Sequence, residues 1–283
     1  MSARGRFLSG LVTIVIALAG FVTIGAVPAA ANSSTVQYVA LGDSYAAGQG
    51  APPYFNEDCL RSAQGYPALL DAEKRIHLRA NETCTGAKTS DLEDTQLAAL
   101  NRGTRLVTLT VAAADLDVSS VAAACTTPGM QDECVAEILR VQTLLGVCPG
   151  GASALDSTLT DLYAEVANAA PKALVVVTGY PLLFEPPTNP NDPNAAIIAA
   201  INKATTDLNC VIERAVDAAD PTGENIVYVD VTAAFAGHGI GAAPSLLFIN
   251  PPGVPDAFHP NAAGYVAYAD LILAELDEQA QLL

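Results

Sequence analysis

The stretch Val36-Gln37-Tyr38-Val39-Ala40-Leu41-Gly42-Asp43-Ser44-Tyr45-Ala46-Ala47-Gly48 decides the fold, because an apolar run ends there at a serine between two glycines. Residues 36–41 have the composition of a buried β-strand. A serine directly after such a strand is either an exposed nucleophile or part of an ordinary tight turn. The two interpretations differ in what the rest of the chain must supply, because a serine hydroxyl is a poor nucleophile until a nearby base removes its proton.

Similar apolar runs recur along the chain and alternate with segments of helical periodicity. Further strands are expected at 75–79, 106–111, 173–178 and 226–231, and helices at 66–74, 91–100, 131–145, 153–169, 194–219 and 261–276. Thr89 or Ser90 is expected to cap the second of these helices. Continuous apolar strands separated by helices predict a parallel sheet of about five strands with helices on both faces. Right-handed crossovers then give a three-layer α/β/α sandwich.

Three positions of interest follow predicted strands directly. Ser44, Ala114 and Gly179 each stand just past a strand end. Ligands of such sheets gather at the carboxyl ends of the strands, so we expect these three positions to share one edge of the sheet.

The first 31 residues have the pattern of a secretory signal peptide. Arg4 and Arg6 form a positive start, residues 7–27 are almost entirely apolar, and Ala29-Ala30-Ala31 offers small residues for cleavage. The apolar run is also long enough to stay in a membrane as an anchor. We expect cleavage, because the small residues follow directly, and a single domain over residues 32–283 with room for a full core. No other stretch is expected to cross a membrane.

The chain is strongly acidic, with a formal charge of −17 over 283 residues that becomes −19 when Arg4 and Arg6 are removed. This field argues against nucleic acid and anionic membrane surfaces as partners. It favours neutral substrates.

Six cysteines in an exported chain indicate three disulfides rather than free thiols. Many pairings are possible, and we prefer sequential closure: Cys59 with Cys84, Cys125 with Cys134, and Cys148 with Cys210. A zinc site needs closely spaced Cys or His groups, which the sequence lacks, so no metal is expected.

A base for Ser44 must come from one of three histidines. His77 falls in a predicted strand and is interpreted as structural. His238 lies in a glycine-flanked loop and is a weak candidate. His259 directly precedes the last predicted helix, and Asp256 three residues earlier can reach its imidazole if the loop bends back. That arrangement would supply the third member of a Ser-His-Asp triad.

Together these motifs resemble the GDSL, or SGNH, family of serine esterases and lipases, from Tyr38 to about Ala274. Gly42-Asp43-Ser44-Tyr45 matches the nucleophile block, and Thr85-Gly86-Ala87-Lys88-Thr89 matches the block whose glycine serves the oxyanion hole. Four further segments look like secreted bacterial members: residues 177–181, the helix around Leu208-Asn209, residues 235–239 and Phe258-His259-Pro260-Asn261. The alternative nucleophile elbow, G-x-S-x-G, is excluded because Ala46 stands where it needs glycine.

The resemblance implies a flavodoxin-like SGNH hydrolase domain at residues 32–283, with Ser44 as nucleophile, His259 as general base and Asp256 as the orienting acid. It also implies an oxyanion hole formed by the backbone N–H groups of Ser44 and Gly86. No cofactor is implied, and the expected partner of this secreted or cell-envelope monomer is a small-molecule or lipid ester.

One block departs from the family. The usual G-x-N-D, whose asparagine amide is a third oxyanion donor, is Ala112-Ala113-Ala114-Asp115 here. Loss of one such donor typically lowers turnover by about 100- to 1,000-fold, so Ala114 predicts a weakened enzyme. The alternative is a catalytically impaired protein of the same fold that binds an acyl or sugar ligand at the cell envelope. Phosphate binding by Gly42, Gly48 and Gly50 is a weaker possibility, since the P-loop lysine is absent.

Overall fold

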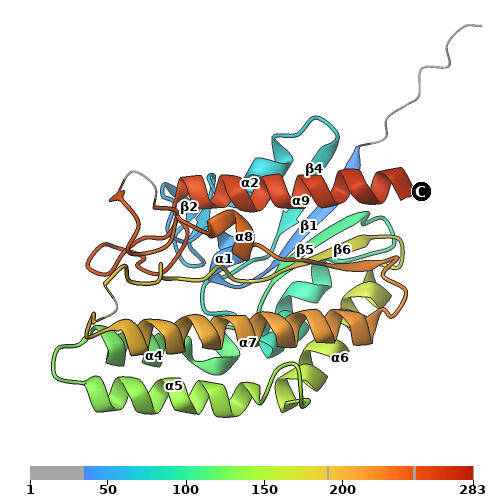
Figure 1. Ribbon diagram of the computed structural model, residues 1–283. Helices are drawn as coiled ribbons and strands as arrows, with labels where there is room; N and C mark the ends of the chain where they lie inside the picture. The colour runs from blue at the N-terminus through green and yellow to red at the C-terminus, as the bar shows by residue number, and fades with distance from the viewer. Residues whose placement is uncertain (1–34, 190, 245–246, 283) are drawn as a thin grey trace, which may run out of the picture. The chain divides into compact units, whose positions relative to one another are not determined.

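Five parallel strands form the centre of the computed structural model, which describes residues 35–189, 191–244 and 247–282 (Figure 1). The sheet runs in the order β4 (Ile76–Asn81), β1 (Val36–Gly42), β5 (Leu106–Thr110), β6 (Leu174–Thr178) and β7 (Ile226–Val229). All neighbouring pairs are parallel, as predicted. The expected signal peptide, residues 1–31, lies outside the described residues.

In the sheet, β4 lies on one side of β1 and β5 lies on the other. This is a doubly wound order, which creates a crevice at the carboxyl ends of β1 and β5. Gly42 at the end of β1 pairs with Thr110 at the end of β5. The segments that follow these strands therefore begin side by side, and they carry Ser44 and Ala114.

Helices cover both faces of the sheet, which confirms the α/β/α sandwich. In Figure 1, α2 (Tyr66–Asp71) and α9 (Ala262–Leu282) lie on one face, and α5 (Gln131–Leu145), α6 (Ala154–Ala169) and α7 (Ala195–Ala219) lie on the other. Aliphatic strand residues such as Val39, Leu109 and Val176 are fully buried between these layers. Shorter elements complete the described fold: α1 (Ser44–Ala47), α3 (Thr89–Asp91), η1 (Leu92–Gln96), η2 (Leu97–Ala99), η3 (Ala114–Leu116), α4 (Val118–Thr126), α8 (Thr232–Phe235), and the hairpin β2 (Tyr54–Asn56) with β3 (Arg61–Ser62).

Two local expectations need correction. The helical segment after Gly86 has Lys88 at its N-cap, and Thr89 and Ser90 are already helical. The hydroxyl of Thr89 donates instead to the carboxylate of Asp115, at 2.7 Å.

In addition, α7 is long and apolar enough to cross a membrane by length and composition, although no such stretch was expected after the N-terminal segment. The helix packs against α5, α6 and β7 within the domain.

The three disulfides pair the cysteines sequentially, as predicted: Cys59 with Cys84, Cys125 with Cys134, and Cys148 with Cys210. The first anchors the loop that carries Gly86, the second joins α4 to α5, and the third fixes the turn after α5 to α7.

Candidate active site

Ser44 is the first residue of α1, directly after the end of β1. The neighbouring Asp43 caps this short helix, because its carboxylate accepts a hydrogen bond from the Tyr45 N–H at 2.9 Å. Asp43 and Tyr45 are buried, whereas Ser44 is only half-buried. The turn thus holds its flanking residues in the core and leaves the serine hydroxyl accessible.

The structure brings Ser44 and His259 together across 215 positions of sequence. The Nε2 atom of His259 lies 2.9 Å from the Oγ atom of Ser44. This distance is within the range needed for direct proton transfer between a nucleophile and its base.

The other imidazole nitrogen meets a backbone oxygen. Nδ1 of His259 lies 3.1 Å from the carbonyl oxygen of Ala257. A carbonyl only accepts hydrogen bonds, so Nδ1 carries the proton and Nε2 presents a lone pair to Ser44. This is the tautomer that a general base requires.

Asp256 lies in the same loop. We expected its carboxylate to contact the imidazole, but it does not. Its oxygens accept hydrogen bonds from Gln49 Nε2 at 3.0 Å and from the Tyr54 hydroxyl at 2.6 Å. The loop curls tightly, with positive φ angles at Asp256 (55°) and Phe258 (67°). This curl directs the Ala257 carbonyl, rather than the Asp256 carboxylate, toward Nδ1.

The segment after α1 supports the histidine loop closely. A Cβ atom at Gly50, where φ is +101°, would come within 2.3 Å of the Pro260 carbonyl oxygen and 2.9 Å of the His259 Cβ. Gly50 also donates its N–H to the Tyr54 hydroxyl at 2.9 Å. Glycine here allows the close approach that keeps His259 against Ser44.

The two residues expected to supply the oxyanion-hole amides lie at the same cavity. Ser44 and Gly86 line one cavity together with His259. Neither N–H donates to another of the described residues. Gly86 has a φ of +74°, which favours glycine, and a Cβ there would meet no atom within 4 Å. The two amides are therefore available to an oxygen of a bound molecule.

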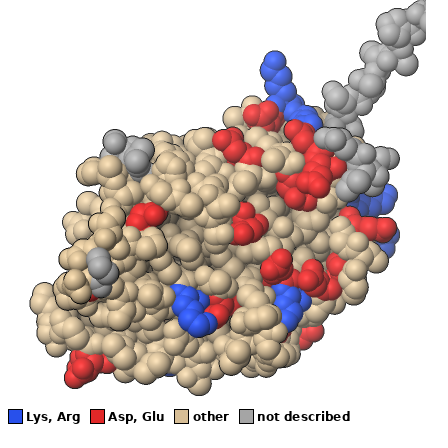
Figure 2. All heavy atoms as spheres, in the orientation of Figure 1, with Lys and Arg blue, Asp and Glu red and all other residues tan. Residues whose placement is uncertain are grey.

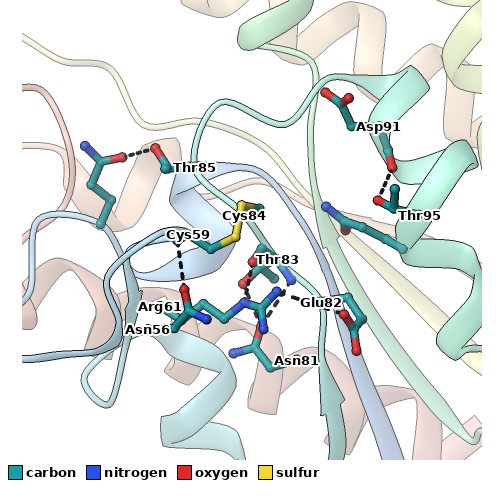
Figure 3. Close-up of a disulfide and its surroundings, with 12 residues drawn as sticks. Asn56, Cys59, Arg61, Asn81, Glu82, Thr83, Cys84, Thr85, Asp91 and Thr95 are labelled. Atoms are coloured by element: carbon teal, nitrogen blue, oxygen red, sulfur yellow. Dashed lines mark hydrogen bonds and ion pairs between the residues drawn. A yellow bond between two sulfur atoms is a disulfide. The ribbon is translucent and has the colours of Figure 1, made fainter.

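The residues just before Gly86 are held by a disulfide and by hydrogen bonds (Figure 3). Cys84 is joined to Cys59 by a disulfide, and its N–H donates to the Gly42 carbonyl at 3.0 Å. The hydroxyl of Thr85 donates to the Gln49 Oε1 atom at 2.6 Å. Through Gln49, the Gly86 loop and the loop of Asp256 share a hydrogen-bond chain.

The block that departs from the family pattern, residues 112–115, keeps the backbone shape of a glycine segment. Ala112 is fully buried and has a φ of +130°, a region that strongly favours glycine. Ala114 lines the same cavity as Ser44, and its methyl group offers no donor. Asp115 accepts hydrogen bonds from the Thr89 N–H and hydroxyl, so its carboxylate is occupied in joining η3 to α3.

A buried hydrogen-bond pair lies behind the nucleophile. The Tyr180 hydroxyl donates to the Asp43 carboxylate at 2.5 Å and accepts from the Ala113 N–H at 3.2 Å. Burial raises the pKa of Asp43 to about 7, although the hydrogen bonds from Tyr180 and Tyr45 lower it. The phenol thus joins the segment after β1 to the segment after β5.

Burial also lowers the pKa of His259 below its ordinary value of 6.5. The Ala257 carbonyl and the nearby charge of Asp256 act in the opposite direction. A depressed pKa keeps the imidazole neutral at neutral pH, which is the state that accepts a proton.

The other candidate residues lie elsewhere. His77 is on β4, with Nδ1 3.8 Å from the Asp71 carboxylate. His238 stacks on Phe248 with ring centroids 3.9 Å apart, and it does not line the cavity of Ser44. The described residues contain no group of three or more His, Cys, Asp or Glu side chains placed to hold a metal ion.

Comparison with known proteins gives one matching family and relatives that are lipases or phospholipases. The family model described as "GDSL-like Lipase/Acylhydrolase family" matches residues 40–267. Lipase 1 of Streptomyces coelicolor is 32% identical over 265 residues, which are 92% of this chain and 94% of the relative. The crystal structure of the extracellular lipase from Streptomyces rimosus has a TM-score of 0.73 at 31% identity, and that of phospholipase A1 from Streptomyces albidoflavus NA297 has 0.74 at 32%. Each covers 85% of this chain and 99% of the solved chain.

Proposed function

Because this chain belongs to the GDSL-like lipase and acylhydrolase family of serine ester hydrolases, we propose that it is an exported enzyme that cleaves carboxylic esters through an acyl-enzyme formed on Ser44. The observation that carries this proposal is the 2.9 Å distance between Ser44 Oγ and His259 Nε2. A free serine far from any base would have no means of losing its proton.

In the first half of the reaction, Ser44 Oγ attacks the ester carbonyl carbon while His259 Nε2 takes the hydroxyl proton. The tetrahedral intermediate then collapses, and the imidazolium returns this proton to the leaving alcohol. In the second half, water attacks the acyl-enzyme with His259 again as the base, and the carboxylic acid leaves. The Ala257 carbonyl holds the ring throughout, because its hydrogen bond to Nδ1 remains in both protonation states.

The negative charge on the intermediate is stabilised by the backbone N–H groups of Ser44 and Gly86. Ala114 provides no third donor, so we expect turnover to be about 100- to 1,000-fold below that of an enzyme with the full set. Asp256 contributes its charge, which favours the imidazolium, and its contacts with Gln49 and Tyr54, which hold the histidine loop.

We propose export through a cleaved N-terminal signal peptide at residues 1–31. Residues 32–283 then act as a monomeric enzyme without a stable membrane span. Three disulfides in the domain agree with export. The partner is a small-molecule or lipid ester rather than nucleic acid. On the face in Figure 2, charged side chains gather toward the right, and the left side, where the loops after the strand ends lie in Figure 1, is largely uncharged. This distribution suits an uncharged substrate.

The proposal is tested by hydrolysis of short and medium p-nitrophenyl esters by the purified, exported protein. We expect measurable turnover that falls on the order of a million-fold, to the background rate, in Ser44→Ala. Equal turnover in Ser44→Ala and wild type would remove the serine from the mechanism.

One observation favours the second candidate, a protein that binds an acyl or sugar ligand without cleaving it: the absent donor at Ala114. A binder needs no reactive hydroxyl, so a serine-directed fluorophosphonate would leave the folded protein unlabelled.

A further inference from the structure

Gln49 contacts three parts of the active site, each through a different group. Its backbone N–H donates to the Ser44 carbonyl at 3.1 Å. Its side-chain Oε1 atom accepts from the hydroxyl of Thr85, the neighbour of Gly86, at 2.6 Å. Its Nε2 atom donates to the carboxylate of Asp256 at 3.0 Å. Gln49 therefore joins the nucleophile segment, the Gly86 loop and the histidine loop.

The backbone of Gln49 is held on both sides, so its side chain starts from a fixed point. Its carbonyl oxygen accepts from the hydroxyl of Tyr265, a fully buried residue of α9, at 2.6 Å. The flanking glycines both have positive φ angles, +90° at Gly48 and +101° at Gly50. A Cβ atom at Gly48 would come within 2.8 Å of the Gly65 Cα atom. This close packing fixes the place from which the amide of Gln49 reaches the two loops.

The two contacts of the side chain require a primary amide. A carboxylate only accepts hydrogen bonds, so the NH₂ group of Gln49 must face Asp256. The amide oxygen then faces Thr85, whose hydroxyl donates to it. A glutamate at this position would set its charge against that of Asp256, and an aliphatic side chain would satisfy neither loop. Because one short planar group makes both bonds, the position of each loop constrains the other.

We propose that Gln49 is a positioning residue whose side-chain amide sets the placement of the Gly86 loop relative to the loop of His259. The inference rests on the proposed function, because it assumes that the Gly86 N–H binds the oxyanion while His259 transfers the proton. Both groups must act on one tetrahedral intermediate, and a displacement of about 1 Å at such a site costs about 100-fold in rate. Gln49 acts on this geometry through Thr85 and Asp256, and not on the reacting atoms themselves.

Gln49→Met tests this role, because methionine has nearly the same length and fills the same space without either hydrogen bond. We expect kcat for p-nitrophenyl butyrate to fall by about 10- to 100-fold. KM should change by less than about threefold, because binding of the ground-state ester does not depend on the alignment of the two loops. Gln49→Ala gives the same comparison if Gln49→Met does not fold.

Gln64→Met is the matched control. The Nε2 atom of Gln64 also donates a hydrogen bond, to the Pro52 carbonyl, but Gln64 does not line the cavity of Ser44. The same substitution there should leave kcat unchanged. An equal loss of kcat in Gln64→Met and Gln49→Met would mean that the effect is not specific to the link between the loops.

The link through Thr85 has its own signature. Thr85→Val removes the hydroxyl that donates to Gln49 and should lower kcat by about threefold to tenfold. Thr85→Ser keeps the hydroxyl and should retain most of the activity. In the Gln49→Met background, Thr85→Val should have almost no further effect, because the acceptor is already absent. Equal losses in both backgrounds would contradict coupling through Gln49.

Failure of this role and failure of the proposed function have different outcomes. If wild type hydrolyses the ester and Gln49→Met has the same kcat, the positioning role is overturned and hydrolysis stands. If wild type hydrolyses no ester, the proposed function fails, and hydrogen exchange measured by mass spectrometry still tests the link. Peptides that contain Gly86 and His259 should both exchange faster in Gln49→Met than in wild type and Gln64→Met. Unchanged exchange in either peptide would overturn the inference.

Discussion

The imidazole of His259 is oriented by the backbone carbonyl of Ala257, 3.1 Å from Nδ1, and not by the carboxylate of Asp256. A backbone carbonyl does not titrate and is not removed by substitution, so it fixes the tautomer of the neutral His259 ring. The carboxylate is left for a supporting role, in which its charge and its contacts with Gln49 and Tyr54 act on the loop.

Asp256→Asn tests this division of roles. In a Ser-His-Asp triad the corresponding change costs about 10⁴-fold in kcat, because the tautomer is lost. Here the tautomer is kept, so we expect a loss of no more than about 100-fold. Asparagine also tolerates the positive φ at this position. Steady-state kinetics with p-nitrophenyl butyrate measure the effect.

Tyr54→Phe is the control, since it keeps the charge of Asp256 while it removes one hydrogen bond from the carboxylate and the acceptor of the Gly50 N–H. It should lower activity less than Asp256→Asn. A loss near 10⁴-fold in a folded Asp256→Asn variant would show that the carboxylate orients the imidazole after all.

Restoring the absent oxyanion donor should increase activity. Ala112 retains a φ of +130°, so the segment keeps the backbone shape of a glycine block. We expect Ala114→Asn, combined with Ala112→Gly to relieve the backbone strain, to raise kcat by at least tenfold. The comparison is with Ala112→Gly alone, which should change thermal stability and leave kcat nearly unaltered. No gain from the added asparagine would mean that its amide does not reach the oxyanion.

The Tyr180 hydroxyl is expected to stabilise the fold through Asp43. Tyr180→Phe removes the donor to a buried carboxylate and the acceptor of the Ala113 N–H, at a cost of about 1–3 kcal/mol in the free energy of unfolding. Thermal denaturation of wild type and variant measures this difference.

The same variant has a pH signature. The folded-state pKa of Asp43 is raised from 3.8 to about 7, so its ionisation weakens folding as pH rises through this interval. Loss of the Tyr180 donor raises this pKa further. The Tm difference between Tyr180→Phe and wild type should therefore widen from pH 5 to pH 8, and a constant difference would contradict a role through Asp43.

The acid limb of the activity profile reports His259. Burial lowers its pKa below 6.5, and only the neutral ring accepts a proton, so the fall of kcat/KM on the acid side should be centred below pH 6.5. Asp256→Asn removes a charge that raises this pKa and should move the limb to still lower pH. A wild-type limb centred above pH 6.5 would not agree with a desolvated imidazole.

Much of the fold follows from local sequence. Continuous aliphatic strands between helices predicted the parallel sheet, and the order of the six cysteines along the chain favoured the pairing that the structure has. The hairpin β2–β3 and helix α4 were not predicted, because their short, mixed sequences carry no clear period. The cavity of Ser44 could not be predicted either, since apolar residues of α7 have the same pattern whether they line a cavity or pack in a core.

Sequence motifs indicated which residues would meet at the site, and the atoms of Ser44 and His259 are indeed adjacent. They could not indicate the partner of Nδ1. A D-x-x-H spacing permits contact between the two side chains. Positive φ angles at Asp256 and Phe258 decide whether the contact forms, and neither residue type predicts such an angle. The backbone of Ala257 has no sequence signal at all.

The central claim is that Ser44 is an activated nucleophile. Its most direct test is reaction of the exported protein with a fluorophosphonate, followed by mass spectrometry of the peptides. We expect one covalent adduct per molecule, on Ser44, with labelling abolished in Ser44→Ala and strongly slowed in His259→Ala. An unlabelled protein that is otherwise folded, or an adduct on another residue, would contradict the account.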